Sequence, residues 1–355
     1  LVKNLELGQL VDPRDLGGSA FGEDDLVHSF PLIAGPAHPA KPHLSAGTGY
    51  GVRGTTQLSN YTPYSVLGTL HLGMVWKFKD HEWRFPGVRV MGILNATPDS
   101  FYDGGRFVSP NDALERARGM VDQGVDVIDV GGESTRPMAA EVGLQQELDR
   151  VLPVIRLIRK ELDVPVSIDT AKSEVARLAV AEGASIINDV SGGRADPAIL
   201  KVAAATGAGL VLMHSRGDPR TMQSLTQYDS VVDDALRELE EALGTAISAG
   251  IPAERIVVDP GFGFAKTADQ NVDLLRELER FRAPGRPVLV GVSRKSFLGA
   301  IANREPEHRL AASLAAQCLA ALRGCDIIRT HDVRETVETL KILNAILAAA
   351  PSDVS

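Results

Sequence analysis

The sequence contains only two cysteines, Cys318 and Cys325, among its 355 residues. They lie seven positions apart in or near one expected helix, with no histidine or further cysteine close by. So few cysteines argue against a disulfide framework and against a cysteine-based metal site. We interpret both as small core residues, and their usage indicates a reducing, cytoplasmic location.

An excess of positive charge and long apolar runs are also missing. The net charge is −9, with no basic stripe, so a nucleic-acid partner is not expected. No apolar run approaches the roughly 18–20 residues of a membrane span, so we expect no membrane partner. The first thirty residues carry several acidic side chains and no long apolar core, unlike a secretory signal. The composition is that of a soluble globular protein.

Residues 1–73 differ in composition from the rest of the chain. They are rich in Gly, Pro, Ser, Thr and His and show no helical or strand periodicity, which predicts a disordered extension. Four of the eight histidines lie here, but they are scattered singly and indicate no metal site. The chain opens with Leu, and Met74 directly precedes the first regular segment. A second hypothesis is therefore that residues 1–73 are not native and that the functional domain is 74–355.

From Val75 onward, the pattern predicts a short β-hairpin and then eight repeats of strand and helix. The expected strands are 88–94, 125–130, 164–168, 185–188, 209–213, 255–258, 287–292 and 326–329. The expected helices are 110–123, 144–162, 172–182, 197–206, 230–249, 270–281, 308–323 and 333–349. This strict alternation predicts an α/β fold, a (β/α)8 TIM barrel preceded by the hairpin and the extension. A doubly wound open sheet is the alternative, but no Gly-x-Gly-x-x-Gly follows the first strand.

Polar residues stand at or near the ends of nearly all of these strands. Because the active site of such a barrel lies at the carboxyl ends of its strands, these residues are the candidates for function. Asp169, Asn188, Asp259 and Lys295 supply carboxylates, an amide and an ammonium, which suit a flat heterocycle such as a pterin or a guanine. The alternative is that each of them caps the following helix.

A second group of residues suits a phosphate or pyrophosphate. Arg329 and His331 are two positions apart on a strand, so their side chains should project to the same side. Ser296 adds a hydroxyl within the run Ser293–Ser296, which brings two cations to one strand end. The alternative is a strand-end Arg beside a surface His. Asn95 could serve as the protein ligand of Mg²⁺, while Asp129 is interpreted as structural rather than catalytic.

The ordered motifs resemble those of the dihydropteroate synthase family over about residues 75–350. The motifs are Met91–Phe101, Gly131–Pro137, Ser167–Thr170, Ile187–Asp189, Asp259–Phe264, Ser293–Ser296 and Arg329–Asp332. The resemblance implies a transferase of folate biosynthesis that joins 4-aminobenzoate to 6-hydroxymethyl-7,8-dihydropterin diphosphate, with release of pyrophosphate. It also implies inhibition by sulfonamides, and a homodimer packed through the last helices of the barrel.

The resemblance further assigns roles to individual residues. The pterin would contact Asp169, Asn188, Met213, Asp259 and Lys295. The diphosphate would contact Asn95, Ser296, Arg329 and His331, with Mg²⁺ at Asn95. The aminobenzoate would contact Thr135, Arg136, Pro137, Phe264, Lys295 and Ser296. The catalytic set would be Asp169, Lys295, Arg329 and His331.

Three positions depart from the usual family pattern, namely Ala96, Tyr102 and Met138. All three lie in or beside the loops bordering the aminobenzoate site, so they bear on sulfonamide affinity more than on the reaction. The rival functions are a pterin-binding methyltransferase domain, a catalytically silent homologue, and a generic phosphate-binding barrel enzyme. The first would have no use for a diphosphate site at Ser293–Ser296 and Arg329–His331.

Overall fold

The computed structural model describes residues 74–97, 109–134 and 139–348. The extension expected over residues 1–73, disordered or not native, therefore lies outside the described residues. The same holds for Thr135, Arg136 and Pro137 and for the departures at Tyr102 and Met138.

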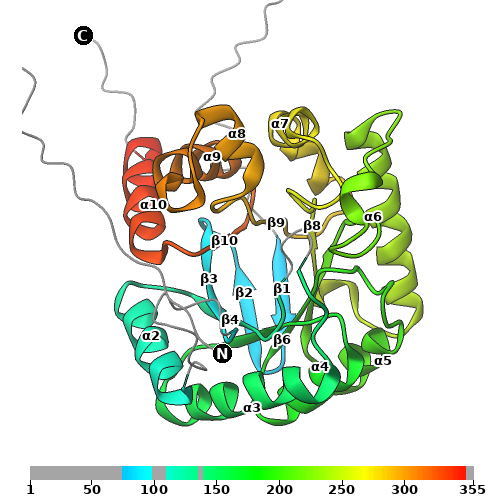
Figure 1. Ribbon diagram of the computed structural model, residues 1–355, viewed down its shortest axis with the longest axis vertical. Coiled ribbons are helices and arrows are strands. Elements are labelled where there is room, and N and C mark those ends of the chain that lie inside the picture. Colours follow the sequence, from blue (N-terminus) through cyan, green and yellow to red (C-terminus); the bar gives the residue numbers. More distant parts are fainter. Residues whose placement is uncertain (1–73, 98–108, 135–138, 349–355) are drawn as a thin grey trace, which may run out of the picture. The chain divides into compact units, whose positions relative to one another are not determined.

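A two-stranded sheet precedes an eight-stranded one in the described part of the chain, and helices surround the strands (Figure 1). The strands are β1 Val75–Phe78, β2 His81–Arg84, β3 Arg89–Asn95, β4 Val127–Gly131, β5 Val166–Asp169, β6 Ile186–Asp189, β7 Gly209–Met213, β8 Ile256–Asp259, β9 Leu289–Val290 and β10 Ile327–Thr330. The helices are α2 Pro110–Asp122, α3 Leu144–Glu161, α4 Ser173–Ala181, α5 Ala198–Thr206, α6 Val231–Ser248, α7 Ala268–Arg276, α8 Ser296–Ala302, α9 Leu310–Leu322 and α10 Val333–Ala348.

The large sheet closes into a parallel barrel. Its strand order is β8-β7-β6-β5-β4-β3-β10-β9, and every neighbouring pair is parallel. A parallel bridge between Val258 and Val288 joins β8 to the segment that leads into β9, so the two ends of the order meet. The predicted TIM barrel is therefore confirmed, and an open doubly wound sheet is excluded.

The amphipathic helices cover the outside of the barrel because each has one apolar face. In α3, for example, Val151, Ile155 and Ile158 are fully buried at intervals of four and three residues. Their partners are strand residues such as Ile128 and Ile168, whose side chains face outward into the same core cluster. The packing of helices on strands holds the strands in place, and with them the residues at the carboxyl ends of the strands.

The β1–β2 hairpin fills the amino-terminal mouth of the barrel. Its strands pair from Val75↔Arg84 to Phe78↔His81, with Lys79 at a φ of 49° in the turn. Trp76, Phe78 and Phe85 pack on residues near the starts of the barrel strands, namely Met91, Val127, Ile186, Val211, Val257, Leu289 and Ile327. The Trp76 indole donates to the carbonyl of Arg255 at 3.0 Å. Because these side chains fill the amino-terminal mouth, the polar strand ends at the opposite mouth are the candidates for a ligand site.

Three details of the structure differ from the predicted alternation. The helix start expected after Ser293–Ser296 is α8, a short helix separate from the one expected over 308–323, so the described residues hold nine α-helices where eight were expected. The chain leaves the sheet after Val290, turns at Arg294 with a φ of 57° and enters α8, which shortens the expected strand 287–292 to two residues. The helix expected over 270–281 is divided into α7 and a 3-10 segment, Leu278–Arg282.

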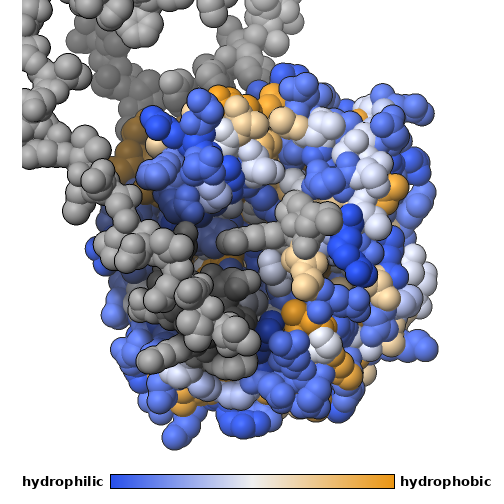
Figure 2. Space-filling model, viewed as in Figure 1, coloured by the Kyte–Doolittle hydropathy of each residue, from blue (hydrophilic) through white to orange (hydrophobic). Residues whose placement is uncertain are grey.

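The visible face is largely covered by hydrophilic residues, with hydrophobic ones in small, separate patches (Figure 2). Within the described ranges, none of the helices combines the length and the apolar character that crossing a membrane requires.

Candidate active site

The predicted site residues meet at the carboxyl rim of the barrel. Asn95, Asp169, Met213 and Asp259 are the last residues of β3, β5, β7 and β8. The register pairs Asp169 with Asn188 and Met213 with Asp259, so polar groups from neighbouring strands stand side by side. Parallel strands of a barrel end at one mouth, which explains why residues far apart in the sequence converge here.

Arg329, on β10, links two carboxylates across the barrel interior. Its Nε lies 2.7 Å from Asp129 Oδ2, and its Nη2 lies 2.6 Å from Asp169 Oδ2. Asn188 Nδ2 also donates to Asp129 Oδ2, at 3.0 Å. Although burial opposes the shift, the two carboxylates raise the pKa of Arg329, so the guanidinium stays charged.

Asp129 was interpreted from the sequence as structural, and its contacts show which residues it holds in place. Its carboxylate is fully buried and fixes both Arg329 and Asn188 through one oxygen. The other oxygen, Oδ1, has no hydrogen-bond partner among the described residues. Asp129 therefore acts on the site by orienting two residues that the sequence did place in it.

The two acidic residues at the rim are poised between protonation states. Burial, together with the carboxylates of Asp129 and Glu147, raises the pKa of Asp169 to about 7, although Arg329 and Lys295 oppose it. Burial likewise raises the pKa of Asp259 to about 6, against the hydrogen bond from the Gly261 N–H and the charge of Lys295. A cation or a hydrogen-bond donor placed beside either carboxyl group would favour its ionised form.

This shift predicts a pH-dependent stability difference between the protein and its Asp259→Asn variant. The folded carboxyl has a pKa of about 6, above its unfolded value of 3.8, so the folded state binds more protons between these values. Its stabilising contribution is thus complete below the unfolded pKa and is lost as the pH rises through the folded pKa. From about pH 4 to pH 7, the protein should lose about 2 kcal/mol relative to the variant.

Urea denaturation of both proteins at the two pH values measures this difference. The Asn side chain keeps an acceptor for the Gly261 N–H, which Asp259 Oδ1 accepts at 2.8 Å, so the comparison isolates the charge. A relative stability that stays constant, or that moves in favour of the unsubstituted protein as the pH rises, would contradict the pKa assignment.

Lys295 stands at the corner between β9 and α8, next to an aromatic ring. Its Nζ lies 4.1 Å from the centroid of Phe264, a contact between a cation and an aromatic ring. Burial and the charge of Arg329 lower the pKa of Lys295 to about 8, while Asp259 and Asp169 oppose the shift. The ammonium therefore lies within the field of both rim carboxylates, as the sequence predicted.

The other three residues of the Ser293–Ser296 run have different surroundings. Ser293 Oγ lies 3.1 Å from His331 Nδ1 and accepts the His331 backbone N–H at 3.2 Å, so it orients the imidazole. The Arg294 guanidinium pairs with Asp332 rather than with the rim groups, so the expectation of two cations directed at one ligand was wrong for Arg294. Ser296 is the first residue of α8.

The alternative interpretation, that the polar strand ends serve as helix caps, does not hold. The N-cap positions of α4, α5 and α7 are Lys172, Pro197 and Thr267, and none of these is a predicted site residue. Lys295 occupies the N-cap position of α8, but its side chain makes no capping hydrogen bond. Asp169, Asn188 and Asp259 therefore do not cap these helices.

A partly buried ion cluster beside the site was missed from the sequence. Lys172 Nζ lies 2.5 Å from both Glu133 Oε2 and Glu147 Oε2, and the Thr170 hydroxyl donates to Glu147 Oε1 at 2.6 Å. Glu147 is fully buried and is one of the charges that raise the pKa of Asp169. Its only sequence signal is an acidic residue in the first turn of α3, which many helices share.

For a metal, the described residues offer a sparse set of protein ligands. They contain no group of three or more His, Cys, Asp or Glu side chains placed to hold an ion. Asn95, half-buried at the end of β3, is the predicted magnesium ligand. A single amide oxygen is compatible with Mg²⁺, which commonly takes few protein ligands and completes its coordination with substrate oxygens and waters.

Comparisons with known proteins agree on one family. The family profile described as "Pterin binding enzyme" matches residues 91–331. A dihydropteroate synthase of Synechocystis is 47% identical over 258 residues, which are 72% of this chain and 89% of the relative.

Solved structures agree with the sequence comparisons. The dihydropteroate synthase of Yersinia pestis in a complex with a sulfonamide drug has a TM-score of 0.74 and 41% identity, covering 78% of this chain and all of that one. The dihydropteroate synthase of Xanthomonas albilineans with 4-aminobenzoic acid has a TM-score of 0.72 and 43% identity, covering 76% of this chain and 96% of that one.

Proposed function

The chain belongs to the dihydropteroate synthase family of pterin-binding enzymes, and on this premise we propose how its barrel mouth carries out the family's reaction. The reaction is a transfer: 6-hydroxymethyl-7,8-dihydropterin diphosphate and 4-aminobenzoate condense to 7,8-dihydropteroate and pyrophosphate in folate biosynthesis. The family is also a target of sulfonamides. Three groups of residues at the mouth serve the pterin, the diphosphate and the aminobenzoate.

The pterin is held by Asp169, Asn188, Asp259 and Lys295, with Met213 beside it. The observation that carries this assignment is the convergence of two carboxylates with raised pKa values and the ammonium of a half-buried lysine at one mouth. Pterin ring N–H groups donate to the carboxylates, while its carbonyl accepts from Lys295. Binding favours the ionised carboxylates, which then stabilise positive charge on the ring.

The diphosphate is held by Asn95, Ser296, Arg329 and His331. Arg329 stays charged, and His331 is oriented by Ser293, so both can donate to phosphate oxygens. The location supports the assignment, because TIM barrels frequently bind phosphate with the loops after their seventh and eighth strands, here β9 and β10. Mg²⁺ bound through Asn95 would neutralise charge on the departing pyrophosphate.

The chemical step follows from these contacts. The C–O bond between the pterin methylene and the diphosphate breaks, and pyrophosphate leaves with the electron pair. Arg329 and His331 stabilise the leaving charge, and Asp169 and Asp259 stabilise the cation left on the pterin. The amine of 4-aminobenzoate then forms the C–N bond and loses a proton. No covalent enzyme intermediate is required.

The aminobenzoate pocket is bordered by Phe264, Lys295 and Ser296. The close contact of the Lys295 ammonium with the Phe264 ring supports this assignment, since it joins a cation for the carboxylate to an aromatic wall. Thr135, Arg136 and Pro137 complete the pocket in this proposal, although they lie outside the described residues.

The proposal extends to domain organisation and assembly. Residues 74–355 form the catalytic domain, and residues 1–73 are dispensable for the reaction. A homodimer packed through α9 and α10 is supported by exposed apolar side chains on both helices: Leu319, Leu322, Ile342 and Ile346. A cytoplasmic location is supported by the two free thiols of Cys318 and Cys325.

A pyrophosphate-release assay tests the proposed function. The full chain should release pyrophosphate from the pterin diphosphate only with 4-aminobenzoate and Mg²⁺ present, and dihydropteroate should form in equal amount. Residues 74–355 alone should give the same rate within about twofold. A folded protein that binds pterin but releases nothing would contradict the proposal and favour a silent homologue.

A further inference from the structure

A fully buried lysine, Lys266, lies behind the loop that follows β8 and takes no part in the reaction proposed above. Only 4% of its surface is exposed. Its Nζ lies 3.0 Å from the carbonyl oxygen of Gly261, 2.9 Å from that of Phe264 and 2.9 Å from His214 Nδ1. An ammonium has three N–H donors, so each donor has one acceptor. Burying a charged group is costly, so the three acceptors that Lys266 contacts should indicate its role.

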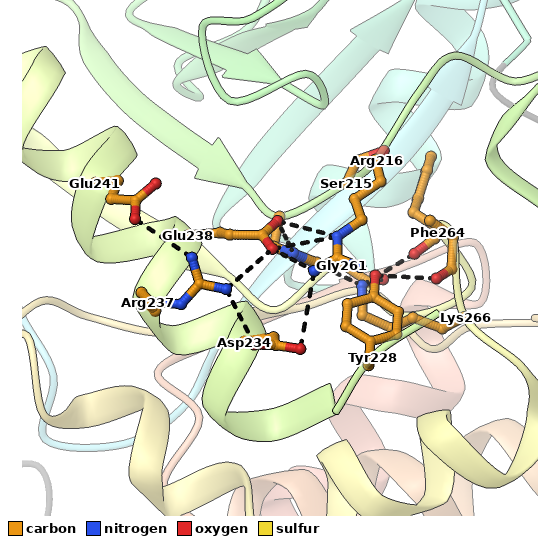
Figure 3. Close-up of polar contacts among 12 residues, drawn as sticks. Ser215, Arg216, Tyr228, Asp234, Arg237, Glu238, Glu241, Gly261, Phe264 and Lys266 are labelled. Carbon is orange, nitrogen blue, oxygen red and sulfur yellow. Dashed lines mark hydrogen bonds and ion pairs between the residues drawn. The ribbon is translucent and has the colours of Figure 1, made fainter. Parts of the chain in front are cut away.

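Its neighbours determine where the protons lie. His214 Nε2 lies 3.0 Å from Glu238 Oε2 on α6 (Figure 3 labels Lys266 and Glu238). If Lys266 were neutral and accepted a hydrogen bond from Nδ1–H, the Nε2 lone pair would face the Glu238 carboxylate, which is repulsive. The consistent arrangement is a charged Lys266, a neutral His214 with its proton on Nε2, and an ionised Glu238.

The electrostatic environment agrees with this arrangement for His214 and Glu238. Burial and the charge of Lys266 lower the pKa of His214 to about 4, so the imidazole is neutral. Although burial opposes it, hydrogen bonds from His214 and Arg216 hold the pKa of Glu238 well below its usual range. Burial lowers the pKa of Lys266 to about 7, while Asp259 and Glu238 favour its charge.

The loop that Lys266 holds has an unusual backbone. Gly261, Gly263 and Ala265 have φ values of 72°, 80° and 51°, all in the left-handed region. A side chain at Gly261 is impossible, because its Cβ would lie 1.8 Å from the His214 carbonyl oxygen. Lys266 donates hydrogen bonds to the carbonyls of Gly261 and Phe264. The Tyr228 hydroxyl donates to the carbonyl of Ala265 at 3.0 Å. These three hydrogen bonds stabilise a backbone conformation that is otherwise unfavourable in free energy for a residue such as Ala265.

This loop carries the wall of the site. Phe264 is buried at the end of the loop, with its ring 4.1 Å from Lys295 Nζ, and Asp259 is anchored to the loop through the Gly261 N–H. Figure 3 shows Lys266 reaching Phe264 and Gly261 from one side while Glu238 and Arg216 lie on the other. The anchor therefore sets the position of Phe264 without touching a substrate, whereas Asp259 belongs to β8 and is held by the sheet.

We propose that Lys266, fixed by His214 and Glu238, is a positioning residue that holds Phe264 against Lys295 and so shapes the aminobenzoate pocket. The inference rests on the proposed function, because Phe264 borders that pocket only if the assignment above is right. It adds a positioning group behind the pocket, at a residue that contacts no substrate.

The test is the Lys266→Met variant, which keeps the length of the side chain and removes all three donors. Amide hydrogen exchange over residues 256–268 should become faster at 261–265. The KM for 4-aminobenzoate should rise about tenfold, more than the KM for the pterin diphosphate, with kcat within about threefold, because the pocket is displaced and the reacting groups are not. Lys201→Met is the matched control, since Lys201 is exposed on α5, and it should change none of these values.

Several outcomes would overturn the inference. Unchanged exchange at 261–265 would show that Lys266 does not anchor the loop. Faster exchange with both KM values unchanged would show that the anchor has no effect on the pocket. A large loss of kcat at constant KM would make Lys266 part of the chemistry. Failure of the proposed function would appear separately, as absent turnover in the unsubstituted chain.

A milder variant guards against a Lys266→Met protein that does not fold. Glu238→Gln keeps the shape of the side chain but removes the charge that fixes the proton on His214 Nε2. It should shift exchange at 261–265 and the KM for 4-aminobenzoate in the same direction by about twofold to fivefold. No shift in either quantity would overturn the role given to Glu238 and His214.

Discussion

Arg329→Ala should lower kcat about a thousandfold, because the guanidinium stabilises charge that develops only as pyrophosphate leaves. The same change removes the cation between Asp129 and Asp169, whose oxygens lie 2.7 and 2.6 Å from it. We therefore expect a loss of about 3–5 kcal/mol in the free energy of unfolding as well. Steady-state kinetics on protein shown to be folded, with urea denaturation alongside, measures both effects.

Arg282→Ala is the control for the stability effect. Arg282 Nη1 lies 2.8 Å from Asp326 Oδ2, and this pair is more buried than the pairs that Arg329 makes. Asp326 directly precedes β10, so this pair lies at the other end of the strand from the site. The control should lose comparable stability and keep kcat within about threefold. Equal losses of kcat in both variants, or an unaffected kcat in Arg329→Ala, would contradict the assignment.

Sequence patterns could predict the site to the extent that it follows from the barrel. Most barrel strands are short and apolar and end in or next to a polar residue, and the carboxyl ends of parallel strands meet at one mouth. That rule alone brought Asp169, Asn188 and Asp259 together. The register confirms it for Asp169 beside Asn188.

Patterns could not predict which buried charges pair with one another. Arg294 was grouped with its neighbour Lys295, yet it pairs with Asp332, 38 positions away, because the chain turns at Arg294 before entering α8. Lys266 directly follows the motif Asp259–Phe264 and Ala265, but its side-chain partner His214 comes from the end of β7 and is held in turn by Glu238 on α6. Such pairings depend on side chains meeting across elements, which neither spacing nor periodicity encodes.

Asp129 is the residue whose importance was most underestimated, since it sits inside a strand and not at its end. Its Oδ2 receives hydrogen bonds from Arg329 Nε and Asn188 Nδ2, which belong to the diphosphate and the pterin assignments. A single buried carboxylate thus couples the two halves of the proposed site. The coupling explains how the leaving group and the pterin can be held in a fixed relation on separate strands.

Asp129→Asn should lower kcat/KM about a hundredfold, because it leaves the Arg329 guanidinium short of one negative partner and sets an amide against the amide of Asn188. Ser167→Ala is the control, since Ser167 lies opposite Asp129 in the register and its buried hydroxyl has no hydrogen-bond partner among the described residues. That variant should keep kcat/KM within about twofold. If Asp129→Asn matches the control, the two halves of the site are oriented independently. If only the pterin KM changes, the carboxylate serves Asn188 alone, and the coupling between the two halves is refuted.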